Sequence, residues 1–167
     1  MPERRSAGLL LYRRRAGAGV DAGGGGDGGD VEVMLVHMGG PFWARKDEGA
    51  WSIPKGEHGS DEEPLAVARR EFEEEIGRPP PEGPLLELGE VRQSGGKVVR
   101  AWALEADIDV SEIESNSFEL EWPPRSGRMR EFPEVDRAEW FDVETARLKL
   151  VRAQGGLLDA LAAALRR

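Results

Sequence analysis

Three glutamates near the middle of the chain have the spacing of one helix face. Glu71, Glu74 and Glu75 stand at positions i, i+3 and i+4, so a helix through this segment would bring their side chains together. Three neighbouring carboxylates repel one another, and a hard divalent cation relieves that repulsion. A glutamate run by itself is more often a solvated helix face. The spacing therefore predicts either an exposed acidic face or an oxygen-ligand site for Mg²⁺ or Mn²⁺.

The surrounding segment has the periodicity of an amphipathic helix over residues 64–76. Pro64 suits the first helical turn, where its missing N–H would have no intrahelical partner. Gly77 suits the C-terminal position, which favours a positive φ. Glu73 points away from the other three glutamates and is expected to be an ordinary exposed charge. The apolar stripe consists of Leu65, Ala68, Phe72 and Ile76.

A longer pattern runs from Gly56 to Gly77. Gly56 is followed after five residues by Glu62, and after seven more by the run Arg70 to Gly77, which reads REFEEEIG. This resembles the pattern of the Nudix hydrolases, G-x5-E-x7-R-E-U-x-E-E-x-G-U, where U is a bulky apolar residue. Arg78 departs from it, because the family usually has an aliphatic residue there, and the departure concerns packing at the helix end.

The resemblance implies a role for each position of the pattern. It implies that Glu71, Glu74, Glu75 and the backbone carbonyl of Gly56 hold the metal, since glycine lets the backbone come close. It also implies that Arg70 and Glu62 orient the acidic residues, as groups around a metal site commonly do. The proton of the attacking water would go to Glu74, Glu75 or a further glutamate from a later loop.

Four glutamates are candidates for that later position. Glu134 stands six residues before Trp140. This resembles the diadenosine-polyphosphate hydrolases of the family, where a glutamate lies six residues ahead of a tryptophan. Glu134 is therefore the expected residue and Glu131 the alternative. The full set is Glu119, Glu121, Glu131 and Glu134.

Two loops carry cationic and aromatic residues that would contact a substrate. Arg45 and Arg125 are expected to bind phosphate, whereas Lys55 fits a phosphate contact and an exposed lysine equally well. Trp43 would stack on a base, as would Phe42 and Trp122, although each fits hydrophobic packing too.

Length, charge and composition restrict the class of protein. The 167 residues suit one domain, and the absence of cysteine excludes disulfides and thiol chemistry. A net charge of −9 disfavours binding to nucleic acid or to an anionic membrane. No apolar run approaches the roughly 20 residues of a membrane helix, and the N-terminal apolar run is too short for a signal peptide. We expect a cytoplasmic protein, either a monomer or a homodimer.

The remaining pattern predicts strands interleaved with helices. A glycine-rich stretch at about 16–30 is expected to be a flexible loop without phosphate-loop spacing. The segments 52–57 and 115–129 read as loop and irregular chain. The resemblance implies an α/β fold, an α/β/α sandwich with a mixed sheet. Strands are expected at 6–14, 31–37, 50–53, 85–93, 97–107 and 138–142, with later helices at 143–150 and 156–165.

The expected activity is Mg²⁺-dependent hydrolysis of a diphosphate linkage in a nucleoside diphosphate derivative or a dinucleoside polyphosphate. The segment GAWSIPKGE is similar to the branch with diadenosine-polyphosphate and diphosphoinositol-polyphosphate hydrolases, and the wider chain to a bacterial group of predicted NTP pyrophosphohydrolases. The partner would be a small phosphorylated molecule. Two alternatives are a house-cleaning NTP pyrophosphatase and a Nudix-fold sensor without activity.

Overall fold

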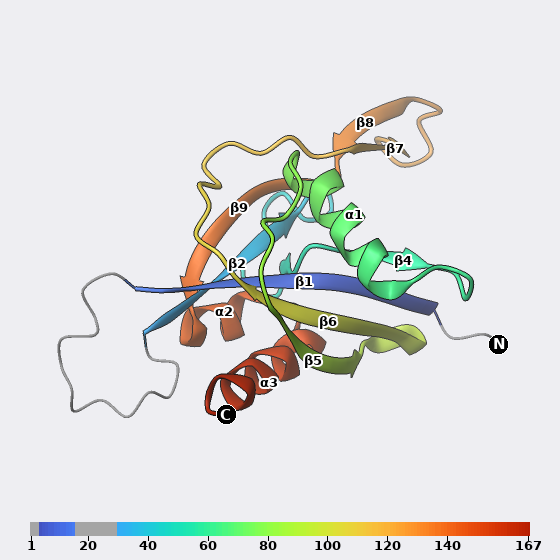
Figure 1. Cartoon of the computed structure of the whole chain (residues 1–167). Helices are drawn as coiled ribbons and strands as arrows, with labels where there is room; N and C mark the ends of the chain where they lie inside the picture. The colour runs from blue at the N-terminus through green and yellow to red at the C-terminus, as the bar shows by residue number, and fades with distance from the viewer. Residues whose placement is uncertain (1–3, 16–29) are drawn as a thin grey trace.

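The computed structural model describes residues 4–15 and 30–167 (Figure 1). The glycine-rich loop expected at about 16–30 falls outside the described residues, apart from Asp30. In the ranges described, none of the helices combines the length and apolar character required to cross a membrane.

Seven of the described strands form one mixed sheet, and two more form a separate hairpin. The sheet order is β3-β2-β1-β6-β5, with β9 paired to β2 and β4 paired to β1. The β1–β6 pair is parallel, whereas the other ladders are antiparallel. The strands of the sheet are β1 (Arg4–Arg14), β2 (Val31–Met38), β3 (Trp51–Ser52), β4 (Lys55–His58), β5 (Leu85–Arg92), β6 (Lys97–Glu105) and β9 (Val135–Asp142).

Helices cover both faces of this sheet (Figure 1). Helix α1 (Pro64–Ile76) lies on one face, while α2 (Val143–Lys149) and α3 (Gly155–Leu165) lie on the other. A short helix, η3 (Arg152–Gln154), joins α2 to α3. This layering confirms the expected α/β/α sandwich with a mixed sheet.

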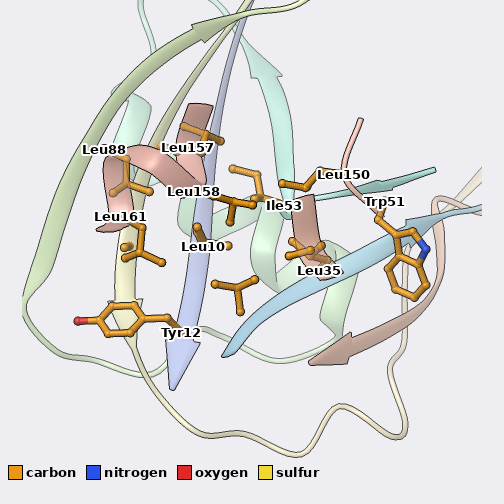
Figure 2. Close-up of a cluster of buried hydrophobic side chains, with 14 of the residues drawn as sticks. Leu10, Tyr12, Leu35, Trp51, Ile53, Leu88, Leu150, Leu157, Leu158 and Leu161 are labelled. Carbon is orange, nitrogen blue, oxygen red and sulfur yellow. The ribbon is translucent and has the colours of Figure 1, made fainter. Parts of the chain in front are cut away.

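Strand β1 shows why the sheet must be covered twice. Its alternate residues point to opposite faces, and both sets are apolar. Leu10 and Tyr12 enter the cluster under α3, which Figure 2 shows with Leu157 and Leu161. Leu9 packs in the second cluster, under α1.

The expected helices and the longer strands are confirmed, with boundaries that differ by a few residues. The loop assignment of 52–57 was wrong in part, because Lys55–His58 form β4 against β1. The irregular assignment of 115–129 was also wrong in part. That segment contains β7 (Ser117–Glu121), which pairs with β8 (Met129–Pro133). Both errors have the same cause: these short polar strands are stabilised by a partner strand rather than by their own pattern.

Candidate active site

Helix α1 fixes the direction in which the motif glutamates point. It begins with Glu63 as N-cap, whose side chain accepts from the Ala66 N–H at 2.9 Å, and with Pro64 in the first turn. It ends at Gly77, whose φ of 96° is the left-handed conformation that the sequence predicted. Phe72 and Ile76 are buried in the core, so the glutamate face is held against the edge of the sheet.

Three carboxylates converge beside this face. Oxygens of Glu71, Glu75 and Glu134 lie within 4.8 Å of one another. Glu71 and Glu75 come from α1, and Glu134 comes from the single-residue connection between β8 and β9. Oxygen donors gathered at this spacing are the ligands that a hard divalent cation prefers.

Gly56 on β4 lies directly against this cluster. A Cβ atom at position 56 would overlap the carboxyl group of Glu71. Only glycine allows the backbone of β4 to come so close to the cluster. The packing therefore requires glycine at position 56, and the metal-binding role of its carbonyl stays a prediction.

Glu75 is the least solvated of the three carboxylates. It is 7% exposed, and its Oε1 atom has no hydrogen-bond partner among the described residues. Burial raises the pKa of Glu75 well above its ordinary value, against the attraction of Lys55. A buried carboxylate oxygen without a partner is costly, and a bound cation would satisfy it. The donor set therefore fits a divalent metal.

Burial also raises the pKa of the other two members. The pKa of Glu71 rises to about 7, with repulsion from Glu74 as the second cause. The pKa of Glu134 is raised by burial and then by the charge of Glu74. Because a cation binds the deprotonated form of a carboxyl group, cation binding at this cluster is coupled to proton release.

Arg70 and Glu62 brace the acidic face. Arg70 pairs with Glu62 at 3.1 Å and lies 3.7 Å from Glu71 and 3.9 Å from Glu74. Glu62 also accepts from the backbone N–H of Gly59 at 2.8 Å, which closes the loop before α1. Glu74 is half-buried beside Glu71 but lies outside the group of three.

Arg78 is exposed and donates to the carbonyl of Asp109 instead of packing at the helix end.

The backbone around Glu134 is held from both sides. The N–H of Glu134 donates to the Asn116 carbonyl at 2.8 Å, and its carbonyl accepts from the Gly39 N–H at 2.9 Å. A Cβ atom at Gly39 would overlap the carbonyl oxygen of Pro133, so this approach also requires glycine. Glu131 instead lies in the exposed β7–β8 hairpin, opposite Glu119. The structure thus brings Glu134 to the cluster and leaves Glu131 outside it.

His37 joins the loop after β2 to the strand that follows Glu134. Its side chain is completely buried, with Nδ1 2.9 Å from Asp136 Oδ1 and Nε2 2.7 Å from the carbonyl oxygen of Lys46. A lone histidine at the end of a strand is usually a buried polar residue, so no pattern in the sequence predicted this link between the two segments.

The expected substrate residues separate into two groups. Trp43 and Lys55 line one cleft of about 570 Å³, beside η3 and the start of β6. Arg45 and Arg125 are exposed and do not line it. Arg125 has a φ of 62° in the turn of the β7–β8 hairpin.

The loop that carries Phe42 and the hairpin that carries Trp122 are in contact. The rings of Phe42 and Trp122 pack edge to face, with their centroids 5.4 Å apart. This contact brings the loop of Arg45 next to the hairpin of Arg125.

Comparisons with known proteins agree with this arrangement. A family model described as the NUDIX domain matches residues 11–161. An RNA pyrophosphohydrolase of Bartonella henselae is 28% identical over 159 residues, which cover 87% of this chain and 79% of that relative.

Solved structures show the same fold. The Ap4A hydrolase of C. elegans, in a binary complex, has a TM-score of 0.61 at 22% identity and covers 98% of both chains. The NUDIX domain of Shewanella oneidensis NrtR, solved with ADP ribose, has a TM-score of 0.60 at 14% identity, covering 99% of this chain and 89% of the other. The resemblance first drawn from Gly56–Gly77 is confirmed by a family model that spans most of the chain. The protein belongs to the NUDIX family and is a Nudix hydrolase, of the class that acts on nucleoside diphosphate derivatives.

Proposed function

We propose that this Nudix hydrolase cleaves a diphosphate linkage in a nucleoside diphosphate derivative or a dinucleoside polyphosphate, with Mg²⁺ as its cofactor and Mn²⁺ as a substitute. The observation that carries the proposal is that oxygens of Glu71, Glu75 and Glu134 lie within 4.8 Å of one another. In addition, the buried Oε1 of Glu75 has no hydrogen-bond partner among the described residues. Mg²⁺ suits an all-oxygen donor set and the phosphate oxygens of a substrate.

The proposed roles follow from burial and position. Glu71, Glu75, Glu134 and the Gly56 carbonyl would hold the cation, with Glu74 at the side of the same face. When bound, the cation would neutralise phosphate charge and lower the pKa of the attacking water. Arg70 would keep Glu71 and Glu74 in place through the contacts described above.

The attacking water must give its proton to a carboxylate that it can reach. Glu75 is buried, whereas Glu74 is half-buried and Glu134 is exposed. Glu74 and Glu134 are therefore the proposed proton acceptors, and Glu75 is proposed as a ligand alone. A carboxylate with a raised pKa, as Glu134 has, is better matched to accepting a proton near neutral pH.

Replacing Glu134 with Gln is expected to lower kcat by about tenfold, because the exposed carboxylate can be replaced in part by water. The matched control is Glu131→Gln, which removes the same charge three residues earlier in the hairpin. We expect that variant to keep the wild-type kcat in a steady-state assay with Mg²⁺. Equal losses in the two variants would remove Glu134 from the proposed site.

Arg45 and Arg125 are proposed to bind the phosphates that lie beyond the cleaved linkage. Replacing either with Ala should raise KM for diadenosine tetraphosphate about fivefold, and KM for ADP-ribose less, because only the longer chain would reach both loops. Metal affinity, measured separately by calorimetry, should not change. A KM increase of the same size for both substrates would contradict this role.

A second candidate is pyrophosphate removal from the 5′ end of RNA, which the relative from Bartonella henselae favours. The net charge of −9 disfavours a long nucleic-acid contact, although it leaves a short 5′ segment acceptable. The other enzymatic alternative is hydrolysis of nucleoside triphosphates to a monophosphate and pyrophosphate.

A substrate screen with Mg²⁺ and with EDTA tests the proposal. The panel contains diadenosine tetraphosphate, ADP-ribose, the common nucleoside triphosphates and a short RNA with a 5′-triphosphate, and the products are resolved by ion-exchange chromatography. We expect Mg²⁺-dependent cleavage of a diphosphate derivative at the highest kcat/KM. A higher value for the RNA or for a triphosphate would replace this substrate class. Failure to cleave any of them would favour a nucleotide sensor.

A further inference from the structure

A β-bulge at the start of β9 is held by a buried histidine. Strand β9 pairs with β2 (Figure 1), and His37 lies opposite Arg137. The next residue of β2, Met38, lies opposite Val135, so Asp136 is one extra residue in β9. A bulge of this kind bends a strand and changes the direction of the side chains beside it, and bulges are frequent next to active sites. The side chain of Asp136 contacts His37, with Oδ1 2.9 Å from Nδ1.

The bulge determines the direction in which Glu134 points. Val135 and Ala138 are three residues apart, so a regular strand would place them on opposite faces of the sheet. Both instead pack in the cluster under α1, because the extra residue between them returns Val135 to that face. Glu134 directly precedes Val135, and its carboxylate lies with those of Glu71 and Glu75. A shift of one residue in this pairing would turn the segment over and take Glu134 away from the cluster.

Two contacts attach this segment to β2 and the residue after it. The first joins the side chains of His37 and Asp136. In the second, the N–H of Gly39 donates to the carbonyl of Glu134 at 2.9 Å. The contacting residues are two apart on each side, so both ends of the segment 134–136 are held. Asp136 is outside the group of converging carboxylates, and its contact with His37 therefore acts on Glu134 through the backbone.

The ring of His37 is fixed in orientation by its other neighbours. Its Nε2 is 2.7 Å from the Lys46 carbonyl oxygen, and its ring packs edge to face on Trp51 at a centroid distance of 5.1 Å. The carbonyl can only accept, so Nε2 carries a hydrogen. Nδ1 and Asp136 then share one further proton, because a neutral ring facing an ionised carboxylate would have no hydrogen for that contact. Since the ring is completely buried, water would not replace a lost contact.

We propose that His37 and Asp136 form a positioning pair, which holds the β9 bulge so that Glu134 reaches the carboxylate cluster. This inference rests on the proposed function, because the pair acts through Glu134. Neither residue belongs to the pattern from Gly56 to Gly77, and neither is a catalytic residue in this proposal.

Two substitutions of Asp136 separate the hydrogen bond from the charge. The side chain is 31% exposed, so both variants should fold. Asp136→Asn removes the charge, but its amide can donate to Nδ1 while Nε2 keeps the Lys46 carbonyl. We expect this variant to keep the wild-type kcat and Mg²⁺ affinity. Asp136→Ala removes the contact, and we expect kcat to fall about fivefold, less than the loss expected for Glu134→Gln. Its Mg²⁺ affinity, measured by calorimetry without substrate, should fall severalfold.

A double-mutant cycle tests whether the pair acts through Glu134. The variant with both Glu134→Gln and Asp136→Ala should lose no more kcat or Mg²⁺ affinity than Glu134→Gln alone, because a carboxylate that is absent cannot be misplaced. Losses that multiply would show an effect independent of Glu134 and would overturn the inference. Wild-type values in Asp136→Ala would overturn it too, as would equal losses in the alanine and asparagine variants.

His37→Phe removes the other partner and keeps a ring of similar size. We expect the same loss of kcat as in Asp136→Ala, and no further loss when the two substitutions are combined. A folded His37→Phe protein with the wild-type kcat would reject the role of the histidine. Circular dichroism shows whether this buried variant folds, and if it does not, the Asp136 variants and their cycle with Glu134→Gln decide the question.

The Mg²⁺ affinity separates this inference from the proposed reaction. If no substrate in the screen is hydrolysed, the reaction is rejected. In that case, lower Mg²⁺ affinity in Asp136→Ala and Glu134→Gln, together with wild-type affinity in Asp136→Asn, would still support the positioning pair. Nucleotide hydrolysis with wild-type kcat and Mg²⁺ affinity in Asp136→Ala would keep the reaction and reject the pair.

Discussion

Replacing Glu75 with Gln is expected to lower kcat/KM by at least about a hundredfold. The substitution keeps the shape of the side chain but removes the charge of a carboxylate that is 7% exposed and has an unpartnered oxygen. A neutral amide at this place would hold a divalent cation poorly, because the ligand would lose its charge in a site with little solvent to compensate. The measurement is a steady-state assay across Mg²⁺ concentrations.

The matched control for this variant is Glu73→Gln. Glu73 belongs to the same helix and is exposed, outside the group of converging carboxylates. We expect it to keep the wild-type kcat/KM and the wild-type dependence on Mg²⁺. Similar activity of the two variants would contradict a metal role for Glu75.

Thermal unfolding gives a second readout for Glu75→Gln. Removing the charge of a buried carboxylate whose Oε1 atom has no hydrogen-bond partner should keep or raise the Tm in EDTA. The rise in Tm that Mg²⁺ causes in the wild-type protein should be largely lost. The Tm of the wild-type protein in EDTA should also depend on pH. The pKa of Glu71 is about 7 in the folded state and 4.5 as its ordinary value. The folded state therefore binds the proton more tightly, and the stability from this group is complete below about pH 4.5 and lost as pH rises through 7.

This sign predicts a lower Tm in EDTA at pH 8 than at pH 6 for the wild-type protein, and a larger increase on adding Mg²⁺ at pH 8. A Glu71→Gln variant should lose most of that pH dependence. An equal pH dependence in the wild-type protein and this variant would show that other groups cause it.

Replacing Gly56 with Ala is expected to lower kcat/KM about a hundredfold. The added Cβ would overlap the carboxyl group of Glu71, so either β4 or the Glu71 side chain must move. A displacement of about 1 Å in a site that positions reacting groups costs on the order of a hundredfold in rate. Because the steric conflict involves one side chain at the edge of the sheet, the protein should still fold.

The control for this variant is Gly83→Ala, where the nearest atom would be Leu104 Cδ1 at 3.1 Å, the end of a flexible side chain. We expect wild-type activity from that control. The affinity for Mg²⁺, measured by calorimetry without substrate, should fall in Gly56→Ala only. Unchanged affinity together with full activity would show that β4 does not contribute to the metal site.

Several features of the site could be predicted because they depend on neighbours in the chain. The periodic apolar stripe, Pro64 and Gly77 determine where α1 begins and ends, and the helix repeat then places Glu71, Glu74 and Glu75 on one face. The same reasoning excluded Glu73, which is exposed. The long leucine-rich strand β1 was predicted because its apolar run extends over many residues.

Other features depend on contacts between distant segments, and the sequence left them open. Glu134 and Glu131 lie close together in the chain, and only the turn into β9, with its hydrogen bonds to Gly39 and Asn116, brings Glu134 to the cluster. The strand β4 likewise exists because β1 offers it an edge.

The sequence by itself determined the acidic helix face, its loop glycine and the family, because helix geometry converts short-range spacing directly into direction. Only the tertiary structure decided that Lys55, Lys97 and Arg152 line one cleft together with the buried Gln154. The physical reason is that strand order and register are set by packing of the whole sheet between its helices. No local pattern in β4, β6 or η3 indicates that these three segments will lie beside one another.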